Sequence, residues 1–197
     1  MKPISLSMLT VCGLEELTLH GSSGVTHVLS ILDPACPEPE AFHAYDRHHR
    51  TILRFHDAIE PAANIVLPEQ HDVEGILTFG RSLANPMDGD GEPHLLVHCH
   101  AGISRSTAAM AMLMAQLDAD QDEDGIFGRL VELRPKAWPN SRMIGFADRL
   151  LVRKGRLTEA LGRLYKRQVS AFPKIELFMR ENGRAHEVEM ARKAQPI

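Results

Sequence analysis

Cysteine is scarce in this sequence: Cys12, Cys36 and Cys99 are the only three among 197 residues. Three cysteines without a paired spacing provide neither a disulfide framework nor a metal site built on cysteine pairs. This scarcity is typical of proteins in a reducing compartment, so we expect a cytoplasmic protein with free thiols.

Long apolar runs are also missing. No stretch is long and apolar enough to form a membrane span, and the opening residues, MKPISL, lack the plan of a signal peptide. The net charge of -4 at pH 7 is small, which argues against a nucleic-acid or membrane-surface partner. The remaining composition is ordinary for a globular protein, and the length suits one domain with a full core.

The most informative stretch runs from His98 to Ser106 and reads HCHAGISRS. The apolar residues 94–97 lead into it like a buried strand, and the apolar residues 106–117 follow it like a buried helix. The loop between them contains Gly102 and small side chains, so successive backbone N–H groups can turn inward. A strand, such a loop and a helix N-terminus together predict a phosphate site.

Cys99 opens this loop and Arg105 closes it. The N–H dipoles, the helix N-terminus and the guanidinium would all favour the thiolate form of the cysteine. The planar guanidinium of Arg105 can hold two phosphate oxygens at once, which a lysine cannot do. The competing interpretation is an inert buried thiol beside a surface arginine, but such a thiol needs no anion-binding loop around it.

The string resembles the phosphate loop of the protein tyrosine phosphatase superfamily, which reads His-Cys, five residues, Arg, then Ser or Thr. The match is closest to the dual-specificity branch and to bacterial phosphatases related to it. The turn RPKAWPN at residues 134–140 is similar to a turn of that family. The resemblance implies a phosphatase domain over residues 1–153 and a helical C-terminal extension over residues 154–197, packed on the same domain or on a partner.

Hydrophobic patterning predicts an α/β protein with three layers, in which a mainly parallel central sheet of about four to five strands is flanked by helices and the C-terminal half is helical. We expect strands at residues 4–11, 26–32, 51–55 and 94–97, and helices at residues 68–83, 106–117, 123–133, 141–152, 157–165 and 174–181. Residues 85–93 are expected to form a solvated loop because of their Asp-Gly-Asp-Gly core. A calcium-binding loop is the alternative, disfavoured because the later Glu of such a loop is missing.

The resemblance implies a role for each residue of the loop. Cys99 would attack phosphorus and form a phosphocysteine intermediate. The phosphate-binding residues would be the six that follow it: His100, Ala101, Gly102, Ile103, Ser104 and Arg105. Ser106 would stabilise the sulfur as a leaving thiolate, cap the helix, or do both. His98 is expected to support the loop from beneath through a ring N–H bonded to the backbone, and His100 to line the rim.

In the family, the proton donor is an Asp on the loop after the strand that precedes the catalytic strand. Asp57 fits this pattern because it follows the predicted strand at residues 51–55 and is itself followed by a loop, AIEP. It would protonate the leaving group and then act as the base that activates water. Asp72 is the alternative, but it falls inside the predicted helix at residues 68–83, where a surface position is expected.

Several other features have two interpretations each. The basic cluster RHHR at residues 47–50 is expected to be a solvated turn, with attraction of an anionic substrate as the alternative, and its His spacing matches no metal-ligand set. Trp138 would pack the proline-rich turn against the core or border the pocket. Cys36 would be an inert thiol or a redox partner of Cys99.

Residues 155–197 would pack as amphipathic helices on the body or on a second copy, or dock a protein substrate.

The leading interpretation is a phosphatase that needs no metal or cofactor and acts on phosphotyrosine in proteins, with phosphoserine and phosphothreonine as further candidates. A phosphorylated protein is the expected partner, and a homodimer through the C-terminal helices is considered. A phosphoinositide phosphatase is disfavoured because the loop has no lysine. A catalytically weak phosphopeptide-binding module is disfavoured because such relatives usually lose the cysteine or the arginine. Thiol chemistry on other oxyanions is disfavoured because the loop lies mid-chain.

Overall fold

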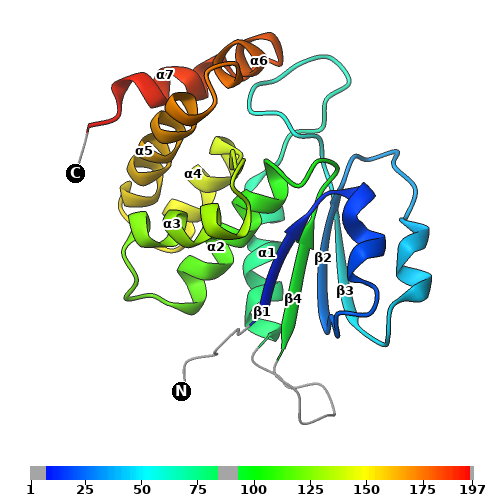
Figure 1. Cartoon of the computed structure of the whole chain (residues 1–197). Coiled ribbons are helices and arrows are strands. Elements are labelled where there is room, and N and C mark those ends of the chain that lie inside the picture. The colour runs from blue at the N-terminus through cyan, green and yellow to red at the C-terminus, as the bar shows by residue number, and fades with distance from the viewer. Residues whose placement is uncertain (1–7, 84–92, 196–197) are drawn as a thin grey trace.

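The computed structural model of the protein describes residues 8–83 and 93–195 (Figure 1). In this part of the chain, four strands form one sheet in the order β1-β4-β2-β3. The strands are β1 (Met8–Cys12), β2 (His27–Leu32), β3 (His49–Arg54) and β4 (His94–His98), and every neighbouring pair is parallel. The predicted fold class, an α/β protein with a parallel central sheet and a helical C-terminal half, is confirmed.

The strand ends differ from the predicted ranges by a few residues. β3 begins at His49 rather than at residue 51, because the His49 N–H donates to the carbonyl oxygen of Thr26 (2.9 Å) and pairing with β2 starts there. β4 continues through His98, which lies beside Cys12 of β1. Residues 4–7 of the predicted first strand, and the predicted solvated loop up to residue 92, lie outside the described residues.

Helices make up most of the rest of the described chain. They are η1 (Leu14–His20), η2 (Glu40–Ala44), α1 (Gln70–Ser82), α2 (Arg105–Leu117), α3 (Glu123–Leu133), α4 (Ser141–Leu150), α5 (Arg156–Ala171), α6 (Ile175–Glu181) and α7 (Ala185–Lys193). The two 3-10 helices and α7 were not predicted, and α5 runs well beyond the predicted residues 157–165. In α7 few positions are apolar and buried, among them Val188 and Ala191, so its sequence carries little helical periodicity.

The sheet is covered differently on its two faces (Figure 1). The α-helices lie on one face, with α2 in the middle of that layer, and residues 105–115 of α2 are all buried. Alanines let this helix approach its neighbours closely, while its methionines fill the irregular space between them. The other face is covered by η1 and η2, whose Leu17 and Phe42 form a smaller core with Val28 and Leu96 of the sheet.

Parallel pairing brings the carboxyl ends of β2, β3 and β4 to the same edge of the sheet. The residues that follow these strands include Asp33, Asp57 and Cys99. In open α/β sheets this edge is where ligands bind. The sheet topology therefore gathers chemistry-bearing residues that are far apart in the sequence.

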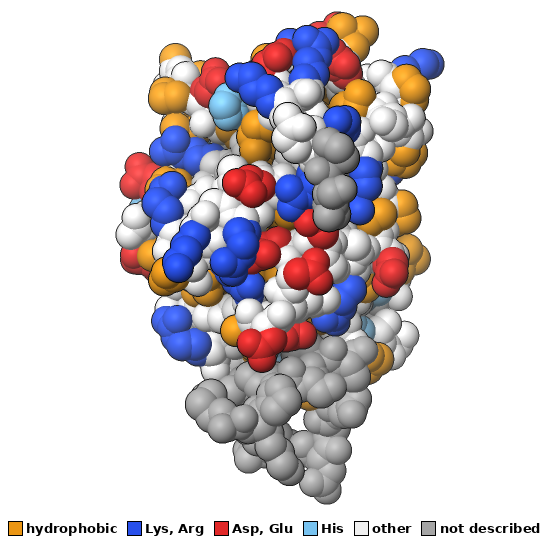
Figure 2. All heavy atoms as spheres, turned by 90° about the vertical axis from the view of Figure 1, so that its left-hand side faces the viewer, with side chains coloured by type: hydrophobic (Ala, Val, Ile, Leu, Met, Phe, Trp, Pro, Cys, Tyr) orange, Lys and Arg blue, Asp and Glu red, His pale blue; other side chains and the backbone are white. Residues whose placement is uncertain are grey.

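The C-terminal helices pack on the body of the same chain: α5 contacts α3 and α4, and α7 contacts α5. On the face that carries α3 and α5, Lys and Arg side chains are interspersed with Asp and Glu rather than gathered in one patch (Figure 2). One such pair joins Arg163 of α5 to Asp124 of α3 at 2.6 Å. Within residues 8–83 and 93–195, no helix combines the length and the apolar character needed to cross a membrane.

Candidate active site

The phosphate loop, residues 99–104, joins β4 to α2. Its tight course depends on Gly102, whose φ of +68° lies in the left-handed region that favours glycine. A Cβ at this position would lie 2.5 Å from the carbonyl carbon of Cys12 and 2.6 Å from the backbone nitrogen of Gly13. The loop therefore packs so closely against the end of β1 that no side chain fits between them.

The carbonyl oxygens of residues 100–104 all accept hydrogen bonds from groups outside the loop. The donors are Leu14 N–H to His100 (2.9 Å), the Arg134 guanidinium to Ala101 (3.1 Å) and Gly102 (3.0 Å), Trp138 N–H to Ile103 (2.8 Å) and Asn140 N–H to Ser104 (3.4 Å). In a trans peptide the next N–H points away from the carbonyl, so the N–H groups of residues 101–105 face the inside of the loop. Those of residues 101–104 have no acceptor among the described residues. This arrangement is an anion-binding nest.

Cys99 lies at the base of the nest and is 2% exposed. Its sulfur is 3.2 Å from the hydroxyl oxygen of Ser106. Ser106 is the second residue of α2, and the N-cap position belongs to Ser104, so the capping alternative for Ser106 does not apply. The Ser106 hydroxyl is placed to stabilise negative charge on the sulfur.

Arg105 is buried at the far end of the loop and bridges the ends of two strands. Its Nη1 donates to Asp33 Oδ1 after β2 (2.6 Å) and to the carbonyl oxygen of Phe55 after β3 (2.6 Å). Its buried Nε has no partner within the described part of the chain and is available to an anion. The sequence analysis did not single out Asp33. Its place directly after a parallel strand, at the edge of the sheet where ligands bind, is the signal that could have found it.

Asp57 contacts the phosphate loop directly. Its Oδ1 accepts hydrogen bonds from Ser104 Oγ (2.7 Å), Asn140 Nδ2 (3.0 Å) and Arg184 Nη1 (3.1 Å). Asp72 instead lies in the first turn of α1, where its Oδ2 accepts the N–H of Glu69 (2.8 Å) in a capping box. Asp72 is also buried, not on the surface as expected, because capping turns its carboxylate back onto the helix end.

The two histidines that flank Cys99 differ in their surroundings. His98 is fully buried, and its Nε2 is 2.6 Å from Ser30 Oγ in β2. The partner of Nε2 is thus a side-chain hydroxyl of β2, and the predicted contact of the ring with the backbone stays a prediction. Burial lowers the pKa of His98 from 6.5 to about 4, so the ring is neutral. His100 is half-buried at the rim, where its Nε2 accepts the N–H of Asp33 (3.2 Å) and burial lowers its pKa.

No protein-family model and no curated protein matches the sequence. Solved structures do match. Human DUSP28 has a TM-score of 0.53 and 16% identity over 76% of this chain and 97% of its own. The human tyrosine phosphatase-like serine/threonine/tyrosine-interacting protein has a TM-score of 0.54 and 19% identity over 76% of this chain and 94% of its own. The PTP-2 phosphatase of Cydia pomonella has a TM-score of 0.53 and 17% identity over 71% of this chain and 83% of its own.

The chain has the fold of the dual-specificity phosphatases. Identities this low show the fold and not the activity, which has to be argued from the site itself.

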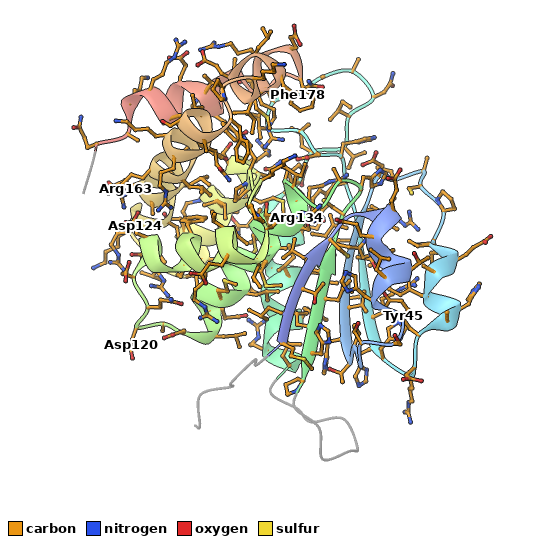
Figure 3. All side chains as sticks on the ribbon, in the orientation of Figure 1. Tyr45, Asp120, Asp124, Arg134, Arg163 and Phe178 are labelled. Atoms are coloured by element: carbon orange, nitrogen blue, oxygen red, sulfur yellow. The ribbon has the colours of Figure 1, made fainter. Side chains whose placement is uncertain are left out.

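In this phosphatase fold, the turn at residues 134–140 holds the phosphate loop from outside. Arg134 reaches the loop carbonyls with two of its nitrogens and Glu16 of η1 with the third (2.8 Å). Figure 3 shows Arg134 near the carboxyl end of the sheet. The sequence identified this turn as a family feature but gave Arg134 and Asn140 no role, because their partners are distant in the chain.

The C-terminal helices in turn hold this turn in place. Trp138 is fully buried and stacks on Tyr165 of α5, with 4.4 Å between the ring centroids. Gln168 of α5 donates to the carbonyl oxygens of Pro135 (2.9 Å) and Ala137 (2.8 Å). Trp138 therefore packs the turn against the core rather than bordering the pocket, and α5 is part of the support for the phosphate loop.

The basic cluster at residues 47–50 lies where β3 begins. β3 begins at His49, at the edge of the sheet opposite the phosphate loop, about 16 Å away for a strand of this length. Arg50 pairs with Glu38 and lies over the ring of Phe42, and its charge contributes to the lowered pKa of His98. Attraction of an anionic substrate by this cluster stays a prediction. In the part of the chain that the structure describes, no group of three or more His, Cys, Asp or Glu side chains could hold a metal ion.

The other two cysteines differ from Cys99. Cys36 is half-buried and its thiol donates to the carbonyl oxygen of Pro37 (3.4 Å), so its suggested redox pairing with Cys99 stays a prediction. Cys12 is buried beside His98 in the sheet register. Burial and the nearby Glu16 raise the pKa of Cys12 to about 12, so it is a protonated, inert thiol.

Proposed function

We propose that this protein is a cysteine-dependent phosphomonoester hydrolase that works through a phosphocysteine intermediate. The observation that carries the proposal is the nest of inward N–H groups, with the Cys99 sulfur at its base 3.2 Å from the Ser106 hydroxyl. A buried sulfur surrounded by hydrogen-bond donors suits a nucleophile that attacks an anionic substrate.

In the first step, the Cys99 thiolate attacks phosphorus in line with the leaving oxygen. The sulfur–phosphorus bond forms as the bond from phosphorus to the leaving oxygen breaks, and Asp57 gives its proton to that oxygen. In the second step, Asp57 takes a proton from water as the water oxygen attacks phosphorus. The sulfur then leaves as a thiolate, which the Ser106 hydroxyl stabilises by donating a hydrogen bond.

The charge of the transferring group is spread over its equatorial oxygens in the transition state. The loop N–H groups and the guanidinium of Arg105 are the donors for those oxygens. Donors that are already held in position need no reorganisation as the charge develops, which makes them effective. The ion pair with Asp33 keeps the Arg105 side chain in place at 2.6 Å.

For the substrate, we propose phosphotyrosine in proteins, with phosphoserine and phosphothreonine as further candidates. A phosphoinositide is less well supported, because residues 100–104 carry no lysine that would bind further phosphates. One structural neighbour is named as a phosphatase-like interacting protein, so a phosphopeptide-binding module is the second candidate function. The presence of Cys99, Arg105 and Asp57 together favours hydrolysis over binding.

A reducing compartment such as the cytoplasm would suit the thiolate, and dimerisation through the C-terminal helices stays a prediction.

The proposal is tested by hydrolysis of p-nitrophenyl phosphate in the presence of a chelator. The parent protein is compared with Cys99→Ser and Arg105→Lys, and Cys36→Ser serves as the matched control for loss of a thiol. We expect turnover by the parent and the control and none by Cys99→Ser, with a phosphorylated Cys99 trapped by rapid acid quench. Turnover that survives Cys99→Ser, or that the chelator abolishes, would exclude this mechanism.

A further inference from the structure

Arg184 connects the C-terminal helices to the proton donor of the proposed reaction. It precedes α7 and is 5% exposed. Its Nη1 donates to Asp57 Oδ1 at 3.1 Å, across 127 residues of sequence, and its Nη2 donates to the hydroxyl oxygen of Ser104 at 3.1 Å. The Ser104 hydroxyl donates in turn to Asp57 Oδ1 at 2.7 Å.

The donors around Asp57 are unevenly distributed between its two carboxylate oxygens. Ser104, Asn140 and Arg184 all donate to Oδ1, whereas Oδ2 receives no hydrogen bond from the described residues. An oxygen that accepts three hydrogen bonds has no room for a proton of its own. When Asp57 is neutral, its proton therefore belongs on Oδ2. The Asp57 side chain is 31% exposed, so its carboxyl group is accessible from outside the protein.

Glu187 neutralises the charge that Arg184 brings to the site. The Arg184 guanidinium binds the Glu187 carboxylate through two nitrogens, at 2.9 and 2.7 Å, and Glu187 is fully buried. Trp138 Nε1 (2.6 Å) and the Ser141 N–H (2.8 Å) complete the shell of Glu187. Burial disfavours the charged form of Arg184, but Glu187 and Asp57 outweigh it and raise the pKa of Arg184 above its ordinary value. An unbalanced positive charge beside Asp57 would favour its ionised form. Because Glu187 balances the charge of Arg184, Arg184 supplies hydrogen bonds without this effect.

We propose that Arg184, held by Glu187, is a positioning residue for general acid catalysis: it fixes Oδ1 of Asp57 as an acceptor, so that Oδ2 carries the proton and delivers it to the leaving oxygen. This inference rests on the proposed function. The inference implies that α7 contributes to the site through Arg184, although this helix lies beyond residues 1–153, the part expected to resemble the family. Arg184 itself does not touch the reacting atoms.

The distinguishing measurement is the dependence of the rate on the leaving group. A general acid matters most for a basic leaving group such as phenolate and least for the much more acidic nitrophenol. We expect Arg184→Gln to lower kcat on phenyl phosphate about tenfold or more, and kcat on p-nitrophenyl phosphate by less than about threefold. Arg184→Lys, which keeps the charge and one donor, should lie between this variant and the parent.

Arg180→Lys is the matched control, because Arg180 lies on neighbouring α6 and pairs with Glu176 and Glu189 away from Asp57. In an Asp57→Asn background, Arg184→Gln should cause no further loss, since both changes act on the same proton transfer. An equal loss on both substrates would mean a merely structural role for Arg184 and would overturn the inference. An unchanged rate of Arg184→Gln on phenyl phosphate would also overturn the inference.

A second variant keeps the inference testable if Arg184→Gln does not fold. Glu187→Gln leaves the Arg184 charge unbalanced, which favours ionised Asp57, so the alkaline limb of the pH–rate profile should move to lower pH. The other titratable groups near Asp57 are His100 of the phosphate loop and Tyr165 of α5, and both are retained. An unmoved limb would contradict the inference. If Cys99→Ser remains active, the proposed function itself fails; if only the leaving-group effect is missing, the inference alone fails.

Discussion

Asp33 and Arg105 form an ion pair in which 2.6 Å separates Oδ1 from Nη1. The pair joins the loop after β2 to the first residue of α2, and so fixes the direction of the guanidinium that would hold the phosphate. Because Arg105 is buried and Asp33 is partly exposed, the carboxylate is the accessible partner for mutation.

Asp33→Asn tests this pair while keeping the shape of the side chain. We expect kcat/KM on p-nitrophenyl phosphate to fall about tenfold, since a charge-assisted hydrogen bond to a partly exposed carboxylate contributes about 1–2 kcal/mol. Steady-state kinetics measures the effect, with Asp46→Asn, an exposed aspartate at the opposite edge of the sheet, as the control. Equal kinetics for Asp33→Asn and the parent would show that Arg105 is held without Asp33.

Arg134→Lys tests whether the shape of the phosphate loop depends on the turn at residues 134–140. A single ammonium group cannot replace the donors that reach Ala101, Gly102 and Glu16 together. We expect kcat to fall about 10- to 100-fold, comparable to the loss of a preorganised oxyanion donor. Binding of inorganic vanadate, a phosphate-like anion, should weaken in parallel. Arg129→Lys on the exposed side of α3 is the control, and a normal vanadate affinity in Arg134→Lys would refute the role.

Gly102→Ala and Gly24→Ala form a matched pair. Both glycines have nearly the same left-handed backbone, with φ of +68° and +67°, but a Cβ at Gly24 meets nothing within 4 Å. The shared backbone cost is about 1–2 kcal/mol. Gly102→Ala should lose about 1–3 kcal/mol more in the free energy of unfolding, because its Cβ overlaps backbone at the end of β1. Urea unfolding measures both variants, and equal losses would show that the loop can move away from β1.

His98 should make the protein less stable in mild acid. Its pKa is about 4 in the folded protein and 6.5 ordinarily, so between these values the unfolded chain binds a proton that the folded protein does not. Stability is therefore unaffected by His98 above pH 6.5 and falls as the pH drops toward 4, by up to about 3 kcal/mol.

The measurement for His98 is urea unfolding at several pH values, compared with His98→Gln. The variant keeps a hydrogen-bonding side chain next to Ser30 but does not titrate. Its stability should fall less steeply over the same interval, even though His27 and His100, whose pKa values are also lowered, contribute to the slope in both proteins. If the free energy of unfolding fell equally steeply with pH in the parent and in His98→Gln, protonation of His98 would not destabilise the folded protein.

Local patterns were sufficient for much of the fold. The apolar run before Cys99 and the alanine- and methionine-rich run after Arg105 identify β4 and α2, because both elements are buried on all sides. The helix at residues 123–133 has the predicted bounds, since Asp122 caps it and its buried positions recur at helical spacing. Asp57 could be proposed as the proton donor because the resembled family carries an Asp after the strand that precedes the catalytic strand, and its role stays a prediction.

The sequence by itself pointed to Cys99 as the proposed nucleophile, to the loop around it and to the parallel sheet, because these show in motifs and periodicity within a few residues. Only the tertiary structure decided that Asp33 pairs with Arg105, that Arg134 turns the loop carbonyls outward, and that Arg184 reaches Asp57 across 127 residues. A polar side chain carries no local signal of its distant partner. The distant partner depends on how buried faces pack, and for Arg184 and Asp57 it depends on the packing of α7 on α5.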